Sequence, residues 1–157
     1  MSQTFPADRI QLPEVAPEQF AAMYRLQASI DFDRRLGDLI RVRASQVNGC
    51  AFCLDMHWKD ARAAGEAEQR LYSLDVWRES PLYEEHERAA LELCDAMTLV
   101  ADGQVPDEVW NRASAAFGED ELAQLVFAIT AINAWNRLII TARVEPGHYE
   151  PSLREAA

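Results

Sequence analysis

The chain has 157 residues, of which 49% are apolar, and carries a formal net charge of −11 at pH 7. This length suits one domain with a sizeable core, and this apolar content excludes a disordered chain. The negative charge repels phosphate backbones and anionic lipid, so we expect no role in nucleic acid binding or at a membrane surface.

The predicted elements begin with an arm, residues 1–16, which carries Pro6 and Pro13 and is expected to be extended. Pro17 then suits a first helical turn, because proline has no backbone N–H to lose there. From this point the apolar spacing is helical almost throughout, and strand signals are almost absent. The predicted helices, in chain order, span residues 17–27, 33–48, 50–65, 66–77, 84–101, 106–117 and 119–143.

The helix ends are marked by residues that favour turns. Asn48-Gly49 ends the second predicted helix, Ser80-Pro81 the fourth and Pro146-Gly147 the last. Residues 144–157 are expected to form a loose tail. With no repeat or linker, the sequence predicts a single all-α domain over residues 1–157, a bundle of about six or seven helices.

Targeting signals are not visible in the sequence. No uninterrupted apolar run reaches the length of a bilayer, and the first residues show no basic region followed by an apolar stretch. Three cysteines are too few for a secreted disulfide scaffold. We therefore expect a cytoplasmic protein, where a C-x-x-C pair is more often catalytic or metal-binding than structural.

Cys50, Cys53 and His57 form the most informative pattern in the chain. Thiols at helical positions i and i+3 have Cα atoms about 5 Å apart, within reach of a disulfide. Cys50 follows the Asn-Gly break, so it falls at a helix start where unpaired N–H groups favour a thiolate. His57 lies one turn beyond Cys53, close enough to take its proton.

Asp38 is a candidate to orient His57, since a carboxylate polarises a histidine base. If the helices on either side of Asn48-Gly49 form an antiparallel pair, Asp38 lies roughly 15 Å back from the turn and His57 roughly 12 Å. The two side chains would then lie at similar depth on facing helices.

Residues 38–57 (DLIRVRASQVNGCAFCLDMH) resemble the core of the alkylhydroperoxidase AhpD-like family, within the carboxymuconolactone decarboxylase superfamily. Residues 59–66 and 131–138 are similar to it too, and together the likeness covers much of residues 17–143. The shared motif is an acid, eleven residues, C-x-x-C, three residues and a histidine.

The resemblance implies an all-helical fold in trimers or hexamers, and peroxide reduction without a bound cofactor or metal. Carried over by position, Cys50 and Cys53 are the redox pair, His57 the relay base and Asp38 the relay acid. The family usually has Glu at that last position, so the shorter Asp38 puts the rate in doubt. The reductant implied is an external dithiol, in the family sometimes a lipoyl group on a partner protein.

Other interpretations stay open. The two thiols could be small core side chains, or zinc ligands that lack a nearby fourth ligand. Cys94 is expected to be a packed core thiol, and Asn133 and Asn136 to bond between helices. The alternative functions are a decarboxylase of a lactone acid, which would leave the thiols unexplained, and a non-catalytic redox sensor.

Overall fold

The computed structural model describes residues 9–151, and within them it contains eight α-helices, two short 3₁₀-helices and no strand. The all-α prediction is therefore confirmed. The elements are α1 (Leu12–Val15), α2 (Pro17–Ser29), α3 (Arg34–Asn48), α4 (Ala51–Ala63), α5 (Glu68–Ser73), η1 (Leu74–Val76), α6 (Glu85–Thr98), η2 (Val100–Asp102), α7 (Asp107–Ala116) and α8 (Glu119–Ala142).

Most predicted helices are present with small shifts at their ends. The predicted helix over residues 66–77 is wrong in part, because α5 ends at Ser73 and the chain tightens into η1. The helix over residues 84–101 likewise ends at Thr98 and continues as η2. The expected arm contains the short helix α1, while residues 1–8 lie outside the described part.

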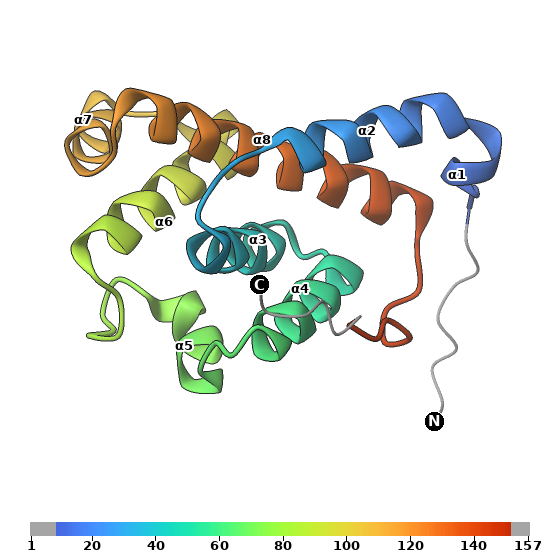
Figure 1. The fold of residues 1–157 in the computed structure, drawn as a ribbon, viewed down its shortest axis with the longest axis horizontal. Helices are drawn as coiled ribbons and strands as arrows, with labels where there is room; N and C mark the ends of the chain where they lie inside the picture. The colour runs from blue at the N-terminus through green and yellow to red at the C-terminus, as the bar shows by residue number, and fades with distance from the viewer. Residues whose placement is uncertain (1–8, 152–157) are drawn as a thin grey trace.

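Helix α3 lies at the centre of the bundle and packs against α4, α6 and α8 (Figure 1). The fully buried side chains come mainly from these elements because their apolar residues recur every three to four positions and so share one face. They include Leu39, Ile40, Val42, Leu71, Leu74, Leu91, Leu93, Leu125, Ile129 and Ile132. Cys94 is fully buried among them, which confirms its expected place in the core.

Helix α2 lies alongside α8 at the edge of the bundle (Figure 1) and buries none of its own residues. The contact is aromatic: Phe20 and Tyr24 lie 5.2 and 5.0 Å from the Trp135 ring, measured between centroids. Edge-to-face and tilted aromatic pairs of this kind contribute stabilising free energy beyond that of the apolar area they bury. Trp135 thus joins the two helices.

Helix α8 is, among the described residues, the one helix long and apolar enough to cross a membrane by length and composition. The sequence predicted no such helix because Asn133, Asn136 and Arg137 interrupt its apolar run. Leu125, Ile129 and Ile132 of this helix are buried in the core, as in the central helix of a globular bundle. The helix therefore has a structural role that needs no bilayer.

The chain after α8 turns back to α4 (Figure 1), and two residues of the tail that was predicted to be loose are bonded to α4. Residues 152–157 of that tail lie outside the described part. The Lys59 ammonium donates to the carbonyls of Gly147 and Tyr149 at 3.3 and 2.9 Å. The Tyr149 hydroxyl donates to Asp60 Oδ1 at 2.6 Å. We call residues 144–151 the C-terminal strap.

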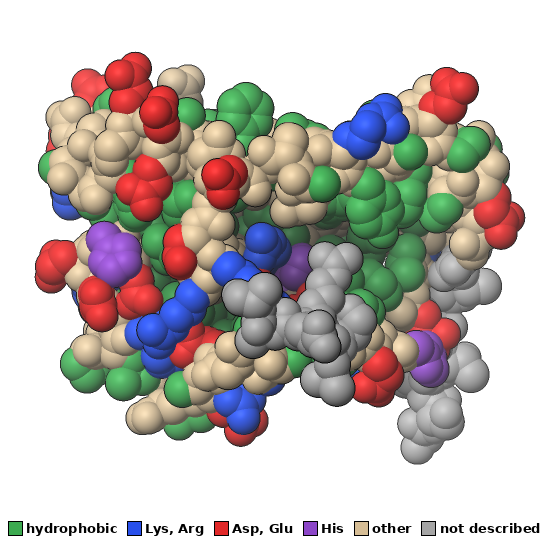
Figure 2. Space-filling model, in the orientation of Figure 1, with side chains coloured by type: hydrophobic (Ala, Val, Ile, Leu, Met, Phe, Trp, Pro, Cys, Tyr) green, Lys and Arg blue, Asp and Glu red, His purple; other side chains and the backbone are tan. Residues whose placement is uncertain are grey.

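Charge is unevenly spread over the surface. Figure 2 shows acidic side chains scattered over one face, with lysine and arginine side chains gathered near α3 and α5. Two buried carboxylates explain part of this clustering: Glu66 pairs with Arg35 and Arg70, and Asp95 with Arg43. Cations at these places neutralise carboxylates that burial would otherwise destabilise.

Candidate active site

The turn between α3 and α4 places the two cysteines. Gly49 follows the last residue of α3 with φ of +66°, a left-handed conformation that glycine adopts without steric cost. The Gly49 N–H bonds the Gln46 carbonyl at 3.1 Å, and the Cys50 N–H bonds the Ser45 carbonyl at 3.0 Å. These bonds close α3 and start α4 directly at Cys50, as the Asn-Gly signal predicts.

Cys50 is the N-cap residue of α4, and its sulfur accepts a hydrogen bond from the Cys53 N–H at 3.4 Å. The two cysteines have Cα atoms 5.4 Å apart and are joined by a disulfide. Both residues are only 1% exposed. The pair thus lies beneath the surface at a helix start, where backbone N–H groups stabilise negative charge on sulfur.

His57 lies one helical turn after Cys53, as its spacing predicts, and its side chain is 14% exposed. Burial, together with the positive charge of Arg41 on α3, lowers the pKa of the His57 imidazole to about 3. The ring is therefore neutral at pH 7 and has a free nitrogen lone pair. A neutral imidazole in this place can accept a proton from a thiol.

Asp38 is buried on α3, and its carboxylate pairs with Arg41 rather than with His57. Asp38 Oδ1 accepts from Arg41 Nη1 at 2.5 Å, and within residues 9–151 no hydrogen bond or ion pair joins Asp38 to the imidazole. Burial raises the pKa of the Asp38 carboxyl although Arg41 opposes the rise. Gly37 leaves room for the guanidinium, since a Cβ there would lie 3.3 Å from Arg41 Nη2.

The structure also brings Asp60 to His57, which the sequence did not suggest. Asp60 Oδ2 lies 3.9 Å from His57 Nδ1, one turn further along α4. The i, i+3 spacing is visible in the sequence, but any helical residue has such a neighbour and the signal alone carries little weight.

Asparagines connect the end of α3 to α8. Asn48 Nδ2 donates to the side-chain oxygens of Asn133 and Asn136, at 3.0 and 2.8 Å. Asn136 in turn donates to Ser45 Oγ at 3.1 Å. The expected interhelical bonds of both α8 asparagines are thus confirmed, and they fix the turn that carries Cys50.

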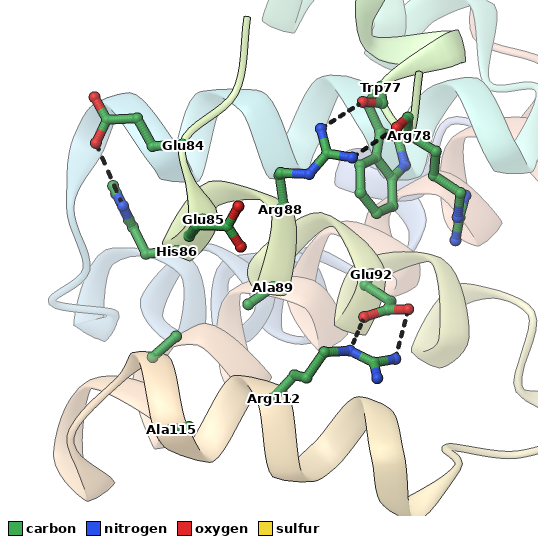
Figure 3. A pocket seen from close by; sticks show the side chains of 11 residues that line it. Trp77, Arg78, Glu84, Glu85, His86, Arg88, Ala89, Glu92, Arg112 and Ala115 are labelled. Atoms are coloured by element: carbon green, nitrogen blue, oxygen red, sulfur yellow. Dashed lines mark hydrogen bonds and ion pairs between the residues drawn. The ribbon is translucent and has the colours of Figure 1, made fainter. Parts of the chain in front are cut away.

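A surface pocket of about 720 Å³ lies elsewhere, between α6 and α7 (Figure 3). Two arginines that line it already have hydrogen-bond acceptors: Arg112 donates two bonds to Glu92, and Arg88 donates to the Trp77 carbonyl. Neither Cys50 nor Cys53 lines it. In the described part of the chain no three His, Cys, Asp or Glu residues are grouped so as to hold a metal ion.

Fold and site together define an all-helical protein with a paired dithiol at a helix start. Residues 17–96 match the carboxymuconolactone decarboxylase family. The chain belongs to this family. A solved structure described as AhpD-like supports its place among the AhpD-like members of the family. The sequence is 44% identical over 139 residues to the uncharacterised protein YdfG of Bacillus subtilis, covering 85% of this chain and 93% of YdfG.

Solved structures of other proteins share this fold. A protein of unknown function from Agrobacterium tumefaciens, proposed as an antioxidant defence protein AhpD, superposes with a TM-score of 0.87 at 39% identity. That match covers 91% of this chain and all of the other. An uncharacterised peroxidase-related protein from Ralstonia eutropha JMP134 with an AhpD core has a TM-score of 0.75 at 15% identity, over 87% and 74% of the two chains. The latter likeness concerns the fold alone.

Proposed function

We propose that this protein is a thiol peroxidase that reduces hydroperoxides through Cys50 and Cys53, with His57 as the base. The observation that carries the proposal is the disulfide at the start of α4 with a buried, neutral imidazole one turn away. Family membership and the likeness to the Agrobacterium protein support it.

The cycle begins with both cysteines reduced. His57 takes the Cys53 proton, and the thiolate attacks the outer oxygen of the hydroperoxide, which breaks the O–O bond. Cys53 becomes a sulfenic acid, and the departing alkoxide takes the proton from His57 to leave as an alcohol. Cys50 then attacks the sulfenic sulfur, which forms the disulfide and releases water.

The two sulfurs have different surroundings, which suggests their roles. Cys50 sulfur accepts the Cys53 N–H, so it is stabilised as the thiolate that leaves when the disulfide is reduced. Cys53 has the nearer base. An external dithiol completes the cycle: it reduces the disulfide and is itself oxidised to a disulfide.

The test is consumption of cumene hydroperoxide with dihydrolipoamide as reductant. We expect wild-type turnover, loss of turnover in Cys53→Ser and Cys50→Ser, and retained turnover in Cys94→Ala, which removes the core thiol. Intact mass after peroxide should fall by two hydrogen atoms in the wild type. Normal turnover in Cys53→Ser contradicts the proposal.

Two other outcomes point to the alternative functions. Disulfide formation without turnover, accompanied by gain or loss of a partner, would favour a redox sensor. Release of carbon dioxide from a lactone acid, insensitive to alkylation of the thiols, would favour a decarboxylase.

A further inference from the structure

The carboxylate that the structure places beside the His57 imidazole belongs to Asp60, and its two oxygens face different groups. Oδ2 lies 3.9 Å from His57 Nδ1, and Oδ1 accepts the Tyr149 hydroxyl at 2.6 Å. A hydrogen bond to one oxygen fixes the rotation of the carboxylate, so the other oxygen stays directed at the ring. At this separation the two groups are not hydrogen-bonded, so a bond between them has to form during turnover.

Tyr149 is itself held in place by α4. Lys59, the residue before Asp60, binds the Gly147 and Tyr149 carbonyls of the C-terminal strap. The same ammonium pairs with Asp55 at 3.0 Å, which limits its motion. The strap is thereby tied to the helix that carries Cys53 and His57, although it lies some 90 residues later in the chain.

Asp38, in contrast, already has a cation. Its bond to Arg41 at 2.5 Å uses one oxygen, and Arg34 attracts the same carboxylate. A carboxylate balanced by a guanidinium gives little net stabilisation to a second cation nearby. The two carboxylates therefore have separate partners: Asp38 has Arg41, and Asp60 has the tyrosine and the ring.

We infer that Asp60, oriented by Tyr149 of the C-terminal strap, is the positioning residue that stabilises protonated His57 during turnover, in place of Asp38. This inference rests on the proposed peroxidase function. The proton passes from the Cys53 thiol to His57 Nε2 and then to the departing alkoxide, while Asp60 remains ionised and forms a charge-assisted bond to Nδ1–H.

The charges around His57 explain why such a partner is needed. Arg41 acts on the ring from α3, Asp60 lies on the same helix as His57, and Tyr149 on the strap bonds Asp60. Asp38 on α3 is close enough to Asp60 for the two carboxylates to repel each other. Burial and Arg41 both disfavour a proton on the ring, so an imidazolium forms readily only if an anion is near. Asp60 is that anion.

The test measures single-turnover oxidation of the reduced full-length protein by cumene hydroperoxide, followed by loss of two thiols, from pH 6 to pH 10. We expect Asp60→Asn to slow this step about 10- to 100-fold at pH 7. Tyr149→Phe should slow it about two- to tenfold, the effect of one lost hydrogen bond. Asp60→Glu keeps the charge and should react at least several times faster than Asp60→Asn.

The pH profile separates a role in proton transfer from a merely structural one. Above pH about 9 a thiol of ordinary pKa ionises unaided, so the deficit of Asp60→Asn should shrink there. Glu68→Gln is the matched control: it removes one negative charge from an exposed position on α5 but leaves the Asp60–Tyr149 pair and the Lys59 contacts, and should react like wild type. Circular dichroism confirms folding of each variant.

Three results would overturn the inference. A wild-type rate in Asp60→Asn at pH 7 contradicts it while leaving the peroxidase function intact. A large loss in Asp38→Asn with none in Asp60→Asn assigns the relay to Asp38. Equal deficits of Asp60→Asn at every pH indicate a structural role only. If wild type itself forms no disulfide with peroxide, the proposed function fails and the inference falls with it.

Discussion

Asp95 on α6 has a buried carboxylate that accepts hydrogen bonds from three side chains. Replacing this residue tests how much a buried ion pair stabilises the bundle. The residue is 5% exposed, and its carboxylate accepts two bonds from Arg43, at 2.7 and 3.2 Å. It also accepts from the Trp77 indole at 3.1 Å and from Arg78 at 2.7 Å. Asp95→Ala would leave the buried Arg43 without this partner.

The expected cost follows from that geometry. Loss of one member of a buried ion pair destabilises a protein by about 3–5 kcal/mol. In a domain of this size that corresponds to a fall in Tm of roughly 6–20 °C, at about 2–4 °C per kcal/mol. Since a domain is stable by only about 5–15 kcal/mol, Asp95→Ala would unfold at much lower denaturant concentration.

The assay is urea unfolding followed by far-UV circular dichroism, with Asp75→Ala as the matched control. Asp75 binds the same Arg43 at 3.2 Å, but its side chain is 76% exposed. An exposed pair contributes about 0–1 kcal/mol, so the control should unfold almost as wild type does. Equal losses in the two variants, or a loss below about 1 kcal/mol for Asp95→Ala, would refute the argument from burial.

Three further predictions concern the site and its assembly. Between pH about 6.5 and about 3, His57 binds a proton in the unfolded chain but not in the folded one. The free energy of unfolding should therefore fall on acidification by up to about 1.4 kcal/mol per pH unit. In urea titrations at several pH values, His57→Gln should flatten this slope. Gly49→Ala places a Cβ on a residue with φ of +66° and should lower the free energy of unfolding by about 1–2 kcal/mol. Gly118→Ala, at φ of −65°, should lower it by less than about 1 kcal/mol. Equal losses in the two variants would contradict the argument. The predicted trimer or hexamer should appear in sedimentation velocity at micromolar concentration, and a monomer throughout would exclude it.

The parts that the sequence predicted depend on neighbours within one or two helical turns. The helix ends, the N-cap position of Cys50 and the spacing of Cys50, Cys53 and His57 all follow from local rules of geometry. Where a boundary was misplaced, as after Ser73, the chain tightened into a 3₁₀ turn that apolar spacing does not distinguish from α-helix. The local pattern is sufficient because helical backbone bonds span only four residues.

What orients the carboxylate beside His57 was decided by the tertiary structure. The sequence suggested Asp38 as that carboxylate, but Asp38 pairs with Arg41 one turn along α3, and Asp60 lies one turn after His57 on α4. The bond between Asp60 and Tyr149 joins residues 89 apart, and the tail that carries Tyr149 was expected to be loose. Side-chain partners of this kind depend on how separate helices and the chain end come together, and periodicity along one helix holds no record of that packing.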